Sequence, residues 1–122
     1  CTNSGFFVLA FTIHLALLGE AGFKRLALLN HQSAVRTAEA FEKTQGVELK
    51  TPAFFNEFTV RLPKPAAEIV SALAEKKILA GVPASRFYPG ALDMRNLLIL
   101  AATEMTTDAD RTALVRGLKE VL

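Results

Sequence analysis

The sequence predicts an α+β domain in which a small, mainly antiparallel sheet carries helices on one face. Residues 55–62, FNEFTVRL, alternate apolar and polar side chains with the period of a strand that buries one face. Residues 96–103, NLLILAAT, form a continuous apolar strand, and the segments around both strands have helical spacing. The 122 residues are enough for one hydrophobic core but not for two.

Two helices are expected before the first strand. The apolar run GFFVLAFTIHLALLG follows capping-type residues and ends at Gly19, which predicts a helix over about 4–18. Because this run is apolar all round, we expect a buried helix, and it is shorter than the ~20 residues of a membrane span. After the GEAG break, residues 20–45 have an amphipathic pattern that ends at Gly46.

The second half of the chain predicts three further elements and a short strand or turn. Pro63 and Pro65 end the first strand, and Pro65 suits the first turn of a helix over about 65–77. The motif ILAGV then leads into a short strand or turn, and NLLILAAT is expected to be central, with both faces covered. The last helix begins at Thr107, with Asp110 in a capping-box position.

Composition excludes some classes of function. Fourteen Lys and Arg against twelve Asp and Glu give a net charge of +2, and the basic residues are spread along the chain, which disfavours nucleic-acid binding. A single cysteine cannot form an internal disulfide, so a reducing, cytoplasmic setting fits best. Because the chain begins at Cys1 rather than at a methionine, we expect it to be a piece of a longer polypeptide.

Known catalytic and metal-binding motifs are absent from the sequence. The only histidines are His14, expected in the core, and His31, expected on the surface, and no Cys-x-x-Cys or His-Glu-x-x-His motif accompanies them. The glycines match no nucleotide-binding loop, and no serine lies in a Gly-x-Ser-x-Gly elbow. We therefore expect no metal site.

Three places remain as candidate sites. The segment CTNSG presents hydroxyl and amide groups where a helix begins, which suits an anion such as phosphate, or else simply caps the helix. The irregular segment SRFYPGALDMRN carries Arg86, Tyr88, Arg95 and Asn96, which could clamp a carboxylate or could be ordinary solvated loop residues. Glu104, after the apolar strand, is either an acid–base group or the start of a turn.

Four blocks of the sequence together resemble the glycine decarboxylase P-protein family, and more narrowly its subunit 1, the alpha chain of the two-chain bacterial form. The resemblance extends over nearly the whole chain. The blocks are CTNSGFFVLAFTIHLALLGEAGFKRLALLN, FFNEFTVRLPKPAAEIVSALAEKKILAG, RFYP and NLLILAATEMTTDADRTALVRGLKEVL.

This resemblance implies a fold type I enzyme that uses pyridoxal phosphate. Residues 47–122 would be its small C-terminal α+β domain, and residues 1–46 a helical segment that leads from the large domain. In this family the cofactor acts as an electron sink while glycine loses its carboxylate as CO2. The aminomethyl group then passes to the lipoyl arm of the H-protein.

The resemblance also implies that this chain does not act alone. None of its seven lysines lies in a context that resembles a Schiff-base lysine, so the cofactor is expected on the partner beta subunit of a heterotetramer. Thr2 and Asn3 match the family's CTN block and would lie near the cofactor phosphate. Arg86 and Asn96 match small-domain positions and would bind the substrate, although structural roles are equally compatible with them.

Two other interpretations stay open from the sequence. The chain could be the small domain of another fold type I enzyme, such as a class V aminotransferase or a cysteine desulfurase, with a Schiff-base lysine upstream in the same chain. Alternatively, it could be a free-standing interaction module that docks through its apolar first helix. A domain cut from a larger enzyme should instead expose apolar surface along residues 6–18 and self-associate.

Overall fold

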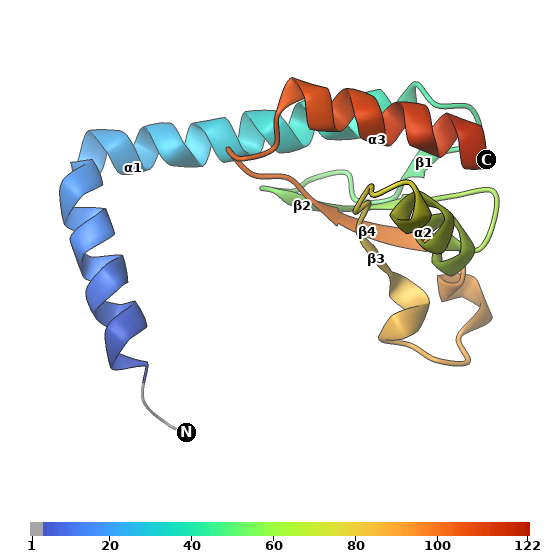
Figure 1. The fold of residues 1–122 in the computed structure, drawn as a ribbon, viewed down its shortest axis with the longest axis horizontal. Helices are drawn as coiled ribbons and strands as arrows, with labels where there is room; N and C mark the ends of the chain where they lie inside the picture. The colour runs from blue at the N-terminus through green and yellow to red at the C-terminus, as the bar shows by residue number, and fades with distance from the viewer. Residues whose placement is uncertain (1–3) are drawn as a thin grey trace.

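The computed structural model describes residues 4–122, which form three helices and a four-stranded sheet (Figure 1). The helices are α1 (Gly5–Glu42), α2 (Ala66–Glu75) and α3 (Asp108–Val121). The strands are β1 (Glu48–Leu49), β2 (Glu57–Arg61), β3 (Val82–Pro83) and β4 (Leu97–Ala101). The predicted α+β class is confirmed.

The sheet has the order β1-β2-β4-β3, and all of its neighbouring pairs are antiparallel. In the central pair, Phe58 lies opposite Leu100 and Val60 lies opposite Leu98. These four side chains are buried on the face that the helices cover. The helices contribute buried side chains to the same core: Ala34, Ala38 and Phe41 from α1, Ile69 and Leu73 from α2, and Leu118 from α3.

The predicted strand over NLLILAAT is central in the sheet, but the expectation that both of its faces are covered was wrong. Leu98 and Leu100 are buried, whereas Leu97 and Ile99 are half-buried and Ala101 is exposed. The continuous apolar run therefore reflects two different surroundings. One face packs against the helices, and the other face is a partly open apolar surface.

The two helices expected at the start are two limbs of α1, separated by a kink at Gly19. Gly19 has φ 61° and ψ −177°, which is a backbone conformation that glycine alone adopts readily. Figure 1 shows the first limb standing away from the rest of the chain, while the second limb lies alongside α3 and the sheet. The second limb ends at Glu42, a few residues before the predicted end at Gly46.

The expectation that the first helix is buried was wrong for this chain. We call residues 5–18 the apolar arm; all of its side chains except that of Leu18 are exposed, with Phe6 at 78% and Leu17 at 82%. The exposure continues into the second limb, where the predicted core residue Phe23 is 52% exposed. Burial in α1 begins only at Ser33. An apolar helix without a polar face is stable in water only when other protein or lipid covers it.

Candidate functional site

The segment between β3 and β4 contains the residues that the sequence singled out for carboxylate binding. It folds into two short 3₁₀ turns, Ala84–Arg86 and Leu92–Met94. The side chains of Arg86, Tyr88 and Arg95 are all exposed. A hollow of about 390 Å³ opens beside this segment. Its lining residues are Pro65, Ala67, Glu68, Ser85, Gly90, Ala91, Leu92 and Arg95.

The structure separates the two arginines of this segment. Arg95 and Glu68 both line the hollow, whereas Arg86 is not part of its lining. A single guanidinium beside a carboxylate makes a weaker anion site than the pair that the sequence suggested. A substrate carboxylate could reach Arg95 here, and Arg86 would need a further surface to complete a site.

Asn96 has a structural contact that the sequence did not reveal. Its side-chain Nδ2 donates to the backbone carbonyl oxygen of Leu62 at 3.1 Å. The Leu62 N–H donates to the backbone carbonyl oxygen of Asn96 at 2.8 Å. This reciprocal pair joins the end of β2 to the start of β4. The binding of substrate by Asn96 stays a prediction, and its side-chain NH2 group already donates to Leu62.

Of the candidate phosphate site at the chain start, the structure describes only the residues from Ser4 onward. Thr2 and Asn3 lie outside the described residues, as does Cys1. Ser4 occupies the N-cap position of α1, but its side chain makes no capping hydrogen bond. Its carbonyl oxygen accepts from the Val8 N–H at 2.9 Å, which is the first turn of the helix.

Of the remaining titratable candidates, Glu104 and His31 contact other residues of the chain. Glu104 Oε2 accepts a hydrogen bond from Asn30 Nδ2 at 2.6 Å, so its carboxylate ties the end of the sheet to α1. His14, expected in the core, lies exposed on the apolar arm. His31, expected on the surface, is half-buried and stacks on Phe55, with its Nδ1 2.9 Å from the Phe55 carbonyl oxygen. Among residues 4–122, no three His, Cys, Asp or Glu side chains gather in a way that suits a metal ion.

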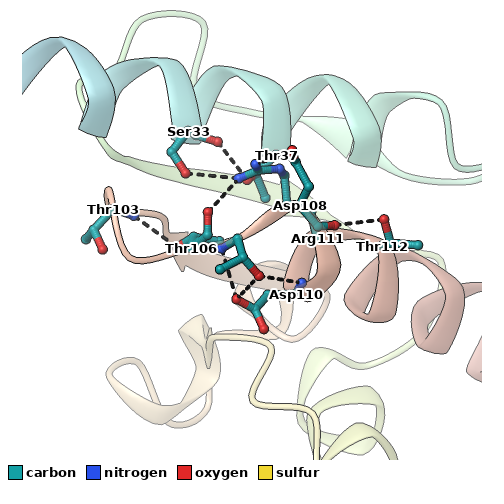
Figure 2. A network of polar contacts seen from close by, with 9 residues as sticks. Ser33, Thr37, Thr103, Thr106, Asp108, Asp110, Arg111 and Thr112 are labelled. Carbon is teal, nitrogen blue, oxygen red and sulfur yellow. Dashed lines mark hydrogen bonds and ion pairs between the residues drawn. The ribbon is translucent and has the colours of Figure 1, made fainter.

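A polar junction that sequence reasoning missed joins α3 to α1 (Figure 2). Arg111 Nη1 donates to Ser33 Oγ at 3.0 Å and to the Thr106 carbonyl oxygen at 3.1 Å, and Nη2 pairs with Asp108. The Arg111 side chain is only 11% exposed, so its bonds to Ser33 and Thr106 are shielded from water, whereas its ion-pair partner Asp108 is 84% exposed. The i,i+3 spacing of Asp108 and Arg111 is visible in the sequence, whereas the partner Ser33 is 78 residues away.

The start of α3 is held by the predicted capping box. Asp110 N–H donates to Thr107 Oγ1 at 3.1 Å, and Thr107 N–H donates to Asp110 Oδ2 at 2.9 Å. Hydrogen bonds from the Thr107 side chain and backbone hold the pKa of Asp110 below its ordinary value of 3.8. The hydrogen bond and charge of Arg111 lower the pKa of Asp108 in the same way.

These pKa shifts predict a loss of stability in acid. A carboxylate whose pKa is depressed in the folded state stabilises that state above the unfolded pKa, and the contribution is lost as pH falls through the folded pKa. We expect the double variant Asp108→Asn, Asp110→Asn to melt below the wild type at pH 6, and the gap in Tm to shrink as the pH falls below the ordinary aspartate value of 3.8. Thermal melts above and below that value measure this gap; a gap that is constant with pH would contradict the assignment.

The apolar arm exposes a continuous run of large apolar side chains. By length and composition alone α1 could cross a membrane, but a core helix of a soluble protein or a signal sequence meets the same criterion. The exposed side chains lie on every side of the arm: Phe6, Phe7, Val8, Leu9, Phe11, Ile13, Leu15 and Leu17. A surface of this kind marks contact with further protein or lipid.

Comparisons with known proteins identify what this chain is similar to. It is 59% identical over 122 residues to the probable glycine dehydrogenase (decarboxylating) subunit 1 of Parvibaculum lavamentivorans. It is 61% identical to the proteins of the same name from Rhodospirillum centenum and Rhodospirillum rubrum. Each match covers the whole of this chain and 27% of the relative, so the chain spans about a quarter of the length of these curated relatives. No family model matches the chain.

Three solved structures have a fold similar to that of this chain. The crystal structure of a glycine decarboxylase (P-protein) of the glycine cleavage system, in inhibitor-bound form, matches 90% of this chain and 24% of its own, with a TM-score of 0.78 and 35% identity. A C-DES mutant with glycine linked to its PLP cofactor has a TM-score of 0.65 at 12% identity, over 81% of this chain and 24% of its own. An aminotransferase from Streptoalloteichus hindustanus has a TM-score of 0.62 at 13% identity, over 84% of this chain and 34% of its own.

These matches confirm the resemblance to the glycine decarboxylase P-protein family and, within it, to subunit 1. Of these structural neighbours, the C-DES mutant contains a PLP cofactor, and the two neighbours at low identity share only the fold with this chain. The name subunit 1 implies that the relatives work with a second subunit.

Proposed function

We propose that this chain is the C-terminal part of the alpha subunit of a cytoplasmic glycine dehydrogenase (decarboxylating), the P-protein of the glycine cleavage system. With a beta subunit, in a heterotetramer, the enzyme decarboxylates glycine and transfers the aminomethyl group to the lipoyl arm of the H-protein. The observation that carries this proposal is the 59–61% identity along the whole chain to subunit 1 proteins.

Residues 47–122 are the small domain in this proposal, and residues 1–46 lead into it from the large domain. Within residues 1–46, the kink at Gly19 separates the limb that packs on the sheet, through Ala34, Ala38 and Phe41, from the apolar arm that does not. The apolar arm before the kink is then enclosed by the part of the polypeptide that the longer relatives possess. Enclosure explains why the arm has no polar face.

The lysines of this chain do not fit a complete cofactor site. All seven are exposed, and three of them form ion pairs: Lys24 with Glu20, Lys50 with Glu48, and Lys76 with Glu120. A Schiff-base lysine is activated by desolvation in an enclosed site, and none of the seven lysines lies in a sequence context that resembles such a lysine. We therefore assign the cofactor to the beta subunit, and no chemical step to this chain alone.

The residues of this chain act in the proposal by completing the site at the subunit interface. Thr2 and Asn3, which precede α1 in the sequence, are assigned to contacts with the cofactor phosphate. Arg86 and Asn96 contribute to substrate binding from the segment before β4. The exposed guanidinium of Arg86 supports this role, because it has no ion-pair partner among residues 4–122 and remains available to a carboxylate.

Locating the cofactor lysine tests this proposal. The full-length parent polypeptide is tagged, purified with its partner, reduced with borohydride and mapped by mass spectrometry. We expect a pyridoxyl group on a lysine of the co-purifying chain and none on Lys24, Lys43, Lys50, Lys64, Lys76, Lys77 or Lys119. A pyridoxyl group on the parent polypeptide itself, with no partner chain present, would favour another fold type I enzyme and overturn the proposal.

A further inference from the structure

A groove of about 710 Å³ runs between the second limb of α1 and α3, on a surface that the proposed function does not use. It contains none of the residues assigned above to cofactor or substrate. Its lining residues are Arg36, Ala40, Asp108, Arg111, Thr112, Val115, Arg116, Lys119 and Glu120. We call this feature the α1–α3 groove.

The α1–α3 groove has an apolar floor and a basic rim. Ala40 and Val115 are half-buried in the floor, while Arg36, Arg116 and Lys119 are exposed along the two sides. Long basic side chains beside apolar surface cover it with their alkyl stems and hold their charges at the edge. An occupant therefore meets apolar surface in the centre and positive charge on both flanks.

The two acidic residues of the groove do not cancel this charge. Asp108 pairs with Arg111, and Glu120 pairs with Lys76, which reaches it from the end of α2. Among residues 4–122, the ion pairs include neither Arg36 nor Arg116 nor Lys119. Arg36 and Arg116 lie near enough to attract Asp108 and Glu120 without forming ion pairs. With four basic and two acidic residues in its lining, the groove keeps a net positive charge.

We propose that the α1–α3 groove docks an acidic amphipathic helix of a partner protein. The apolar stripe of that helix lies on Ala40 and Val115, and its flanking carboxylates meet Arg36 on one side and Arg116 and Lys119 on the other. A helix laid in a groove between two others buries an apolar seam in this way, and complementary charges fix its orientation. A small anion is a poorer fit, because the cations lie on two sides of the groove rather than around one point. Within residues 4–122, every buried side-chain polar atom already has a hydrogen-bond partner, so none is left for a small ligand to satisfy.

A designed peptide tests the proposed chemistry on the full-length parent polypeptide. The probe is a fluorescein-labelled 16-residue helix with leucines at i, i+3, i+4 and i+7 and glutamates on the flanks. We expect binding that weakens about tenfold between 0.05 and 0.3 M salt, because rim charges contribute through screened attraction. A second probe with lysines in place of the glutamates should not bind.

Variants of the groove give the decisive comparison. Arg36→Glu with Arg116→Glu should weaken binding of the acidic probe about tenfold or more, because each replaces an attraction with a repulsion. Arg25→Glu is the matched control, an exposed arginine on the same helix outside the groove, and it should leave the affinity unchanged. Equal loss in the control, binding of both probes, or no binding of the acidic probe would each overturn the proposal. These binding measurements need neither cofactor nor glycine. Their outcome is therefore independent of the proposed enzyme activity.

Discussion

Replacing Gly81 by alanine is expected to lower the free energy of unfolding by about 3 kcal/mol or more and to separate β3 from β4. Gly81 has φ 156°, and a Cβ at this position would lie 2.4 Å from the Ile99 carbonyl oxygen. That oxygen belongs to the backbone of the central strand, which cannot move without breaking the register of Val82 opposite Ile99. Urea unfolding and hydrogen exchange of the peptides that span residues 82–101 measure the loss.

Gly90→Ala is the matched control for this effect. Gly90 also has a positive φ, 91°, but a Cβ there would meet no atom within 4 Å. Its substitution should cost only the backbone strain, about 1 kcal/mol, and should leave exchange in β4 unchanged. Equal costs for the two variants would mean that backbone conformation, rather than the contact with Ile99, decides the stability at Gly81.

Replacing Leu9 by aspartate is expected to destabilise the full-length parent polypeptide by about 4 kcal/mol, enough to remove most of the soluble folded protein. Leu9 is 59% exposed here, in the middle of the apolar arm. If the rest of the parent encloses the arm, the substitution buries a carboxylate without a partner. Soluble yield and thermal unfolding of the parent measure the effect.

Gln32→Asp, at an exposed position on the second limb of the same helix, provides the control. It introduces the same carboxylate into α1 at a position that stays in water, so its cost should be within about 0.5 kcal/mol. A parent carrying Leu9→Asp that is as stable as the control would show that the arm remains exposed in the whole protein. The arm would then be a docking surface or a membrane segment.

Local patterns in the sequence predicted the elements that depend on neighbouring residues. The alternation of Phe58, Val60 and Leu62 identified β2 and its buried face, and all three side chains are buried. Thr107 and Asp110 form the predicted capping box, and Gly19 breaks the first helix where expected. Capping and periodicity act over a few residues, so they can be read from the sequence directly.

Features that depend on distant residues could not be predicted in this way. The contact of Arg111 with Ser33 spans 78 residues, and β1 is only two residues long, too short for a periodic signal. Burial of the apolar arm was expected from its composition, but composition does not say which part of a protein covers a helix. Asn96 was chosen for its chemistry, yet its amide bonds the Leu62 carbonyl oxygen, which only the paired strands bring near.

The proposed function extends beyond this chain, because the curated relatives are much longer than it. The described residues supply a small α+β unit with a partly open sheet face, an exposed arginine segment and an apolar arm. In the proposed function these features complete a site whose cofactor is held by the beta subunit. The central claim is therefore that activity requires two different polypeptides.

Reconstitution of the two purified chains tests this claim most directly. The full-length parent and its partner are prepared separately and assayed, alone and mixed, for CO2 release from carboxyl-labelled glycine with lipoylated H-protein and pyridoxal phosphate present. We expect release only from the mixture. Release by the parent polypeptide alone at the rate of the mixture, or no release from a mixture that forms a stable complex, would contradict it.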